Sequence, residues 1–365
     1  MQKSAYLFSP LLMTGIIMLH NLAMQTDGPY VFYKNDQIFI KKILGADSGK
    51  TLQQDSISLS DKKSISLQVN THIAGNTFTV KLKENLQIEP AEFPMPARQL
   101  ILSDIEGNFG AFSKLLLANG VIDTGFNWTF GNGHLVLIGD FVDRGEMVTE
   151  VHWLIYSLEE KAKAAGGYVH YILGNHEIMN MSGDLRYLNE KYKTSAALMN
   201  VKFETLYDEH SELGRWLRTK NIMEKIGDNL FIHAGVSSLM NQLNISVEEI
   251  NKLARPFYAD SLYTYPDKKT PVIFSDFGPF WFRGYYGANK TDMLQTIDST
   301  LSGFDVKHIF TGHTIVGDTV SVWYNGKVIN TDLHHAGGIS EAVLIERKNY
   351  FRVNTRGEKF PLKVK

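Results

Sequence analysis

The chain has 365 residues, of which 44% are hydrophobic and 21% are charged, an ordinary balance for a globular protein. The formal net charge is −2 and there is no lysine- or arginine-rich block, so a nucleic acid is not an expected partner. No cysteine is present, which excludes disulfides, cysteine-ligated zinc and thiol nucleophiles, so any metal ligands must come from His, Asp, Glu or Asn.

The N-terminal residues predict an export signal. Lys3 precedes a stretch without Asp, Glu, Lys or Arg from Ser4 to Thr26. Its apolar part, Ala5 to Leu19, has the length of a signal-peptide hydrophobic region, and Ala23 is a small residue suited to a cleavage point. We therefore expect residues 1–25 to be a signal peptide and the protein to be periplasmic or extracellular. The alternatives are an uncleaved membrane anchor or a buried N-terminal helix. Only the anchor would attach the protein to a membrane.

Short runs from Tyr30 to about Glu92 have the pattern of β-strands. They mix β-branched or aromatic residues with polar ones, and turn-forming residues separate them. The runs are YVFYK, QIFIKKIL, SISLQV and TFTVKL. Residues 28–95 therefore predict a small antiparallel β unit, which ends at a rigid, proline-rich connection. This unit carries no chemical signal, and the sequence leaves its role and the oligomeric state open.

Strands and helices alternate from Gln99 onward. Buried strands are expected at 99–103, 134–139 and 167–173, with helices at 111–119 and 148–165. This order implies right-handed crossovers and a mostly parallel, covered sheet. Each strand ends in a polar loop that contains glycine, namely SDIEGN, GDFVDRG or GNHE. Because ligands bind beyond the carboxyl ends of such strands, we expect the three loops to lie side by side at one sheet edge.

The pattern is less regular after the third loop. Residues 178–225 and 242–265 are expected to be helical, and strands are expected at 229–233 and 306–310. These two strands run into His233 and into the Thr-Gly-His sequence that ends at His313. Further on, SVWYNGKVINT carries Asn-Gly between two strand-like runs, which favours a tight hairpin. The last residues, 351–365, are expected to form a C-terminal tail.

Residues that bind metals or transfer protons follow five of the expected strands. They are Asp104 and Glu106, Asp140 and Asp143, Asn175 and His176, His233, and His313. Capping and turn formation explain one or two such residues, but carboxylates gathered together repel one another and are costly to desolvate. Divalent cations remove that cost, and a metal pair needs a bridging ligand and several terminal ligands. The pattern therefore predicts a two-metal site.

Two of these loops resemble the signatures of a known family. GDFVDRG at 139–145 and GNHE at 174–177 are similar to motifs of calcineurin-like metallophosphoesterases, specifically of the phosphoprotein phosphatase branch. The runs GNHEIMNMSGDLRY and GPFWFRGYY look closest to the Shewanella-like protein phosphatases. The resemblance covers about residues 97–345. It implies an α/β fold, a four-layer αββα sandwich over residues 97–350, which the small N-terminal antiparallel β unit precedes.

The resemblance implies six metal ligands. They are Asp104 and Glu106 for the first metal, Asp140 as the bridge, and Asn175, His233 and His313 for the second metal. The family's first motif normally has histidine where Glu106 stands, so the first metal would have protein oxygen ligands alone. Hard ions are then favoured over zinc there. We expect two divalent or mixed-valence ions, with manganese first and iron, magnesium or zinc as alternatives. Whether Glu106 binds metal or points away stays open.

The resemblance also implies four catalytic residues, His176, Asp143, Arg144 and Arg283. His176 would protonate the leaving oxygen while Asp143 holds its ring, as a carboxylate beside a catalytic imidazole does. The arginines would clamp the phosphate, whose oxygens match the planar guanidinium fork. The expected reaction is direct attack by metal-bound hydroxide, without a phosphoenzyme.

These residues predict a hydrolase that acts on phosphate monoesters. Its substrate would be a phosphoprotein, at Ser/Thr or Tyr, or a small phosphate ester, because a fold alone does not fix a substrate. A phosphodiesterase or dinucleoside polyphosphate hydrolase is one alternative, since it would use the same metals. A metal-poor binding module, suggested by Glu106, is the other.

Overall fold

The structure is a computed structural model, and it describes residues 25–45, 49–71, 76–262, 264–287 and 290–364. The expected export signal falls almost wholly on residues 1–24, outside the described ranges. Within those ranges, no helix has the length and apolar character that would let it cross a membrane.

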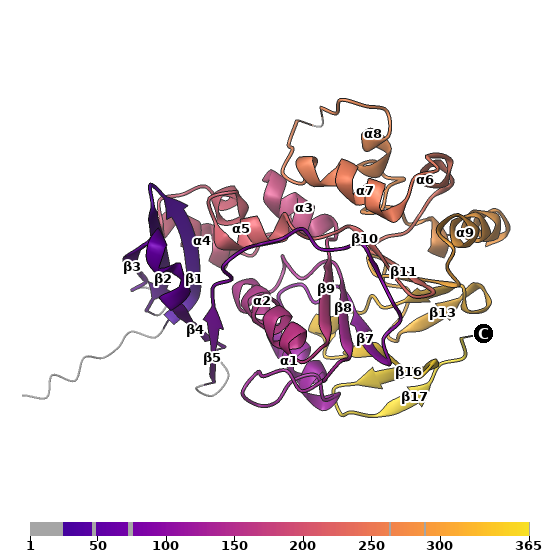
Figure 1. Cartoon of the computed structure of the whole chain (residues 1–365), viewed down its shortest axis with the longest axis horizontal. Helices are drawn as coiled ribbons and strands as arrows, with labels where there is room; N and C mark the ends of the chain where they lie inside the picture. The colour runs from indigo at the N-terminus through magenta and orange to yellow at the C-terminus, as the bar shows by residue number, and fades with distance from the viewer. Residues whose placement is uncertain (1–24, 46–48, 72–75, 263, 288–289, 365) are drawn as a thin grey trace, which may run out of the picture.

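Two six-stranded mixed sheets form the centre of the molecule (Figure 1). The first runs β17 (Lys359–Pro361), β16 (Asn349–Asn354), β15 (Glu341–Glu346), β7 (Arg98–Leu102), β8 (His134–Ile138) and β9 (Tyr168–Ile172). The second runs β13 (Ser321–Trp323), β14 (Val328–Asn330), β12 (His308–Thr311), β11 (Asn229–Ile232), β10 (Met223–Ile226) and β6 (Glu92–Phe93). The predicted strands β7, β8 and β9 are parallel, as expected.

Alternating side chains show how the sheets are layered. In β8, Leu135 and Leu137 join the core that includes the helices, whereas Val136 and Ile138 join a second cluster with Phe231 of the other sheet. Because successive side chains of a strand point to opposite faces, the second cluster is the interface between the sheets. The expected four-layer αββα sandwich is therefore confirmed.

Helices cover the two outer faces (Figure 1). On the first sheet lie α1 (Phe109–Ala118) and α2 (Val148–Ala164). The second is covered by α6 (Ser238–Gln242), α7 (Val247–Ala254), η3 (Arg255–Phe257), α8 (Thr270–Ile273), η4 (Gly284–Tyr286) and α9 (Lys290–Phe304). Between β9 and β10 the chain forms α3 (Asn175–Ser182), α4 (Glu190–Leu198), η2 (Phe203–Tyr207) and α5 (Glu212–Leu217).

The N-terminal β unit packs on the helical layer. It has a three-stranded antiparallel sheet, β1 (Gln25–Lys34), β2 (Gln37–Leu44) and β3 (Thr51–Ser58), followed by η1 (Leu59–Ser64) and the hairpin of β4 (Ser66–Asn70) and β5 (Thr77–Lys81). The indole of Trp153 in α2 donates a hydrogen bond to the carbonyl of Pro29 at 2.8 Å, and the hydroxyl of Tyr156 accepts one from Lys83 N at 2.7 Å. The unit thus shares its core with the rest of the chain.

Three differences from the sequence expectations concern strands. β3 is polar and largely exposed, so it carries no alternating signal. β10 begins within 178–225, where only helix was expected; its four residues become a strand because they pair with β6 and β11. Residues 351–365, expected as a tail, supply part of β16 and all of β17, which extend the first sheet. The hairpin of β13 and β14 around η5 (Tyr324–Gly326) is confirmed.

Candidate active site

The five predicted loops and the segment after β14 meet around one cavity of about 420 Å³. Three loops follow β7, β8 and β9 of the first sheet, and two follow β11 and β12 of the second. The order of the strands in the sequence predicts that all five loops lie at the edge of one sheet. In the structure they lie at the edges of two facing sheets, because β7 pairs with β15, while β11 and β12 pair with each other in the second sheet. The cavity is lined by Asp104, Glu106, Asp140, Arg144, His176, Arg283, His313, Thr314, Ile315, Asp332, Leu333 and His334.

Six predicted site residues have left-handed backbone conformations. Their φ angles are 53° at Asp104, 49° at Glu106, 60° at Asp140, 67° at Asp143, 54° at Arg144 and 65° at His313. Residues other than glycine seldom adopt these angles, because the Cβ atom crowds the backbone. Such conformations persist where surrounding structure imposes them, and they cluster at functional sites. The loops after β7, β8 and β12 are thus strained where they bring these side chains together.

Asp140, His233 and His313 form the centre of the site. Each offers one metal-ligand atom, and these atoms all lie within 4.8 Å of one another. The three residues are at most 6% exposed. Burial opposes protonation of His233, but the neighbouring Asp140 carboxylate outweighs it and raises the His233 pKa to about 9. The same carboxylate would attract a cation to this point.

The ring of His233 is oriented toward this centre. Its Nδ1 lies 2.8 Å from the carbonyl oxygen of Ile138, and its Nε2 lies 3.0 Å from Oδ1 of Asn175 and 3.1 Å from Oδ2 of Asp140. A backbone carbonyl on one ring nitrogen leaves the other free for a metal. Gly139 permits this approach, since a Cβ at this residue would lie 2.7 Å from Nδ1 of His233. Asn175 and His233 therefore lie directly behind the residues that line the cavity.

His313 places a potential ligand atom, its ring nitrogen Nε2, in a buried position. A hydrogen bond with the backbone of Trp281 holds its ring, while the buried Nε2 has no hydrogen-bond partner among the described residues. An unsatisfied buried nitrogen is costly and calls for an explanation. The site offers a carboxylate oxygen from Asp140, an amide oxygen from Asn175 and one imidazole nitrogen each from His233 and His313. This set of ligand atoms suits a divalent transition metal. The residues present thus fit a metal ion.

His176 and Asp143 form the expected pair. Nδ1 of His176 lies 2.6 Å from Oδ2 of Asp143, whose Oδ1 accepts a hydrogen bond from Nδ2 of Asn180 at 2.7 Å. Burial opposes protonation of His176, but Asp140 and the hydrogen bond to Asp143 outweigh it and raise its pKa above the usual value. Nε2 of the same ring is on the cavity side, 3.8 Å from Oδ2 of Asp140. Nothing in the sequence singles out Asn180, which sits one helical turn after His176.

Asp104 and Glu106 are both in the cavity wall, in different surroundings. Asp104 is buried, and each of its carboxylate oxygens accepts the His313 amide at 3.2 Å. Burial and the nearby Asp332 carboxylate raise the pKa of Asp104 well above its usual value. Glu106 is partly exposed and forms an ion pair with Arg144. Arg144 therefore holds the Glu106 carboxylate at the cavity wall.

Both predicted arginines reach the cavity from the solvent side. Nη1 of Arg283 donates to the carbonyl of His313 at 2.7 Å and to the hydroxyl of Thr314 at 3.2 Å. The guanidinium of Arg144 lies 4.9 Å from the ring centre of Tyr187, which is itself 5.0 Å from the His176 ring. Tyr187 is 43% exposed, so one side of the entrance is aromatic.

Two other residues bear on the site from the C-terminal part of the chain. Asp332 lines the cavity and was not predicted; burial and Asp140 raise its pKa to about 8. Its signal would have been its place just after β14, in the same strand-end position as the predicted ligands. His335 is buried, and its Nε2 lies 3.1 Å from the carbonyl oxygen of Ser103, so it supports the loop that bears Asp104.

Glu177 anchors the loops after β8 and β9. Its carboxylate accepts hydrogen bonds from the backbone amides of Asp140 at 2.9 Å, Phe141 at 2.7 Å and Gly174 at 2.7 Å. It also accepts one from the hydroxyl of Tyr171 at 2.9 Å. The loops after β8 and β9 are therefore joined through a single buried side chain.

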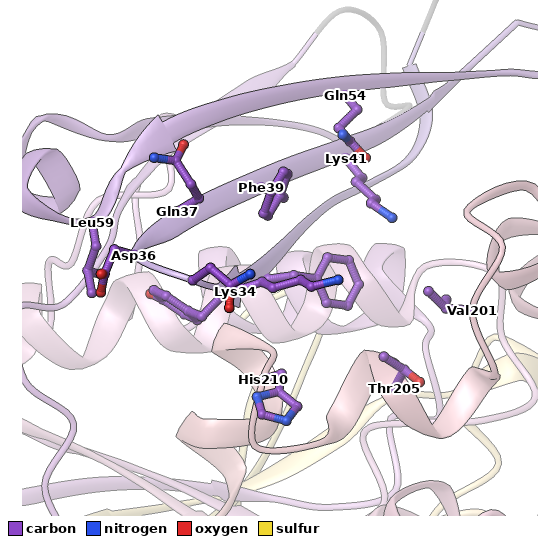
Figure 2. Close-up of a pocket in the computed structure, with 13 residues that line it drawn as sticks. Lys34, Asp36, Gln37, Phe39, Lys41, Gln54, Leu59, Val201, Thr205 and His210 are labelled. Atoms are coloured by element: carbon purple, nitrogen blue, oxygen red, sulfur yellow. The ribbon is translucent and has the colours of Figure 1, made fainter.

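A larger cavity, about 700 Å³, lies apart from these residues. Figure 2 shows it between the strands β1 and β2 and the segment from Val201 to His210, with Phe39 and Lys41 along the strand side. None of the predicted metal or catalytic residues lines it. Size alone therefore does not identify the reactive site of this molecule.

The sequence matches a known family over most of its length. The profile of the family described as calcineurin-like phosphoesterase matches residues 97–317. Shewanella-like protein phosphatase 2 of Arabidopsis thaliana is 25% identical over 324 residues, which are 74% of this chain and 80% of that protein. An uncharacterized protein of Schizosaccharomyces pombe is 30% identical over 236 residues, which are 61% of this chain and 69% of the other.

A solved structure is similar to nearly the whole chain. It is the crystal structure of the cold-active protein-tyrosine phosphatase of a psychrophilic Shewanella species, with a TM-score of 0.82 and 35% sequence identity. The similarity covers 92% of this chain and 99% of that one. It therefore includes the N-terminal β unit, which lies outside the family profile.

Proposed function

Because this chain belongs to the calcineurin-like phosphoesterase family, we propose that it is a metal-dependent phosphatase that hydrolyses phosphate monoesters. Membership of the family implies a phosphoesterase that uses metal ions. The main support for hydrolysis of phosphate monoesters is that three features meet around one cavity. These are the ligand atoms of Asp140, His233 and His313, the pair of His176 with Asp143, and two arginines at the entrance.

We assign two metal positions to the cavity. Asp104, Glu106 and Asp140 would hold one ion, and the other would be held by Asp140, Asn175, His233 and His313. Bound metals would lower the pKa of a water molecule at the site and offset the charge of the phosphate. Manganese is the metal we favour, since oxygen ligands predominate around the first ion.

The protein side chains divide the remaining work. Arg144 and Arg283 would bind the phosphate oxygens and orient the ester for in-line attack by water. As the bond from phosphorus to the leaving oxygen breaks, Nε2 of His176 would give its proton to that oxygen. Asp143 would keep the ring in place and stabilise its charged form before the transfer. Water attacks phosphorus directly in this scheme, and no phosphoenzyme forms.

We propose phosphotyrosine in proteins or peptides as the substrate class. Relatives of this chain are named protein phosphatases, and one similar structure is named a protein-tyrosine phosphatase. The entrance agrees with an aryl ester, since Tyr187 and Ile315, 43% and 52% exposed, provide an aromatic and an apolar surface beside the arginines. Phosphoserine and phosphothreonine have no ring to fill this entrance.

Hydrolysis of a chromogenic aryl phosphate tests the proposal. Purified protein is stripped with a chelator and assayed with Mn²⁺, Mg²⁺, Fe²⁺ or Zn²⁺, with metal content measured on the same samples. We expect no turnover without metal, the highest turnover with Mn²⁺, and faster cleavage of phosphotyrosine peptides than of phosphoserine peptides. Faster cleavage of a bis-aryl phosphate would favour a phosphodiesterase. Folded protein without turnover under any condition would favour a metal-poor binding module.

A further inference from the structure

A third buried carboxylate belongs to the wall of the metal cavity. Asp332 is 5% exposed, while Asp104 and Asp140 are 4% and 2% exposed. Its amide donates to Oδ1 of Asn330 at 2.8 Å, and the backbone of Leu333 hydrogen-bonds its carboxylate. These hydrogen bonds hold the Asp332 carboxylate at the cavity wall, away from bulk solvent.

The fold fastens this segment against the loop that bears Asp104. The hydroxyl of Thr331, directly before Asp332, donates to Oγ of Ser103 at 2.9 Å. Nε2 of His335, three residues after it, lies 3.1 Å from the carbonyl oxygen of Ser103. Because Ser103 immediately precedes Asp104, contacts on both sides of Asp332 hold its segment against the loop of Asp104, and both residues line the cavity.

The two arginines of the cavity make their hydrogen bonds and ion pair with groups other than Asp332. Arg144 forms its ion pair with Glu106, and Arg283 donates to the His313 carbonyl and to Thr314. Three buried carboxylates so placed repel one another unless a cation joins them. An independent observation points to such a cation: the buried Nε2 of His313, which has no hydrogen-bond partner in the described part of the chain, faces the same centre as Asp140.

We infer that Asp332 is a further oxygen ligand of the metal held by Asp104 and Asp140. The inference rests on the proposed function, since it assigns one more ligand to the same site. It makes the first metal position rich in carboxylates even when Glu106 remains paired with Arg144. Hard cations such as Mn²⁺ suit such a position.

Calorimetric titration of the metal-free protein with Mn²⁺ tests the inference without any assay of activity. The variant is Asp332→Asn, which keeps the shape of the side chain and removes its charge. We expect the natural protein to bind two Mn²⁺ ions per chain, and the variant to bind one of them about 10–100-fold more weakly. Asp318→Asn, at an exposed position on the loop between β12 and β13, is the matched control and should bind as the natural protein does.

Melting temperatures separate a ligand from a packing residue. Without metal, Asp332→Asn should melt at or above the temperature of the natural protein, because it removes an acidic group that Asp104 and Asp140 crowd. With saturating Mn²⁺ the variant should gain less stability than the natural protein. A lower melting temperature in both conditions with unchanged Mn²⁺ affinity would overturn the ligand role. If Asp332→Asn does not fold, Asp332→Ser is titrated in its place, with the same expected loss.

A second variant separates the role of Asp332 from the proposed function as a whole. Asp104→Asn serves as the second comparison, because Asp104 is an assigned ligand. Loss of Mn²⁺ binding in Asp104→Asn with unchanged binding in Asp332→Asn would remove Asp332 alone from the ligand set. Absence of both Mn²⁺ binding and hydrolysis in the natural protein would overturn the proposed function, and the role of Asp332 with it.

Discussion

Replacing His176 with asparagine removes the proposed proton donor and little else. In the structure Nδ1 of His176 lies 2.6 Å from Asp143, so an asparagine amide can still donate to that carboxylate. The amide cannot give up a proton to a leaving oxygen. We therefore expect kcat to fall by ~10²–10⁴, the usual contribution of a positioned general acid, which corresponds to about 3–5 kcal/mol in the barrier.

The size of this effect should depend on the leaving group. Phenol, like the tyrosine side chain, has a pKa of about 10 and leaves poorly without a proton, whereas nitro-substituted phenols leave readily as anions. We expect the full loss with phenyl phosphate and phosphotyrosine peptides, and only a small loss with dinitrophenyl phosphate. Steady-state kcat values for a series of aryl phosphates, measured on both proteins, provide the comparison.

The pH dependence of the same two proteins gives a second readout. Asp140 and Asp143 raise the pKa of His176, so its acidic form should persist to a higher pH than that of an ordinary imidazole. The kcat of the natural protein should fall as pH rises through that raised pKa, and this fall should be absent in the variant. His210→Asn, at an exposed histidine outside the site, is the control. An equal loss of kcat for every leaving group would refute the role of His176 as an acid.

Three further expectations concern other parts of the molecule. Arg283→Lys should lower kcat/KM by about 10–100-fold, because lysine lacks the planar fork that binds two phosphate oxygens; equal kcat/KM values in a steady-state assay would contradict this. Glu159→Gln should destabilise the fold by about 3–5 kcal/mol in urea unfolding, since it leaves the buried Lys83 and Lys220 without their shared carboxylate. Burial raises the pKa of Glu159, but Lys220 and Lys83 outweigh it and lower the pKa to about 2. The stability from this group is therefore complete above its unfolded pKa of about 4.3 and is lost as pH falls toward 2, and the Gln variant should lack that acid-dependent loss. If residues 1–25 are an export signal, as we propose, the mass of the protein purified from the periplasm or medium should lack them, while an uncleaved anchor would leave the full mass in the membrane fraction.

Local sequence determined the strands and loops that carry the chemistry. β7, β8 and β9 are apolar runs that end in polar, glycine-containing loops, and the structure reproduces all three with their parallel order. The loop residues were found because their types are those that bind metals and move protons. The structure brings all ten predicted site residues around one cavity, either in its wall or directly behind it.

Sequence patterns did not show which strands would become neighbours. The pairing of β15 with β7 joins residues about 240 positions apart, and it separates the strands into two facing sheets. Hydrophobic alternation reports that a strand has a buried face but not which partner covers it. For the same reason, β10 and the C-terminal strands became visible only through their pairing partners.

Asp332 was not predicted for the same reason, because its place in the site depends on contacts with a distant segment. By itself, an aspartate in NTDLHH is an ordinary turn residue. It becomes part of the site because Thr331 and His335 bond to Ser103, more than 200 residues earlier in the chain. Residue types and their local spacing thus determined which loops could hold metal ions. Only the tertiary contacts decided which other side chains share that cavity. Those contacts form between segments far apart in the chain, and the local pattern of one segment does not specify which other segment packs against it.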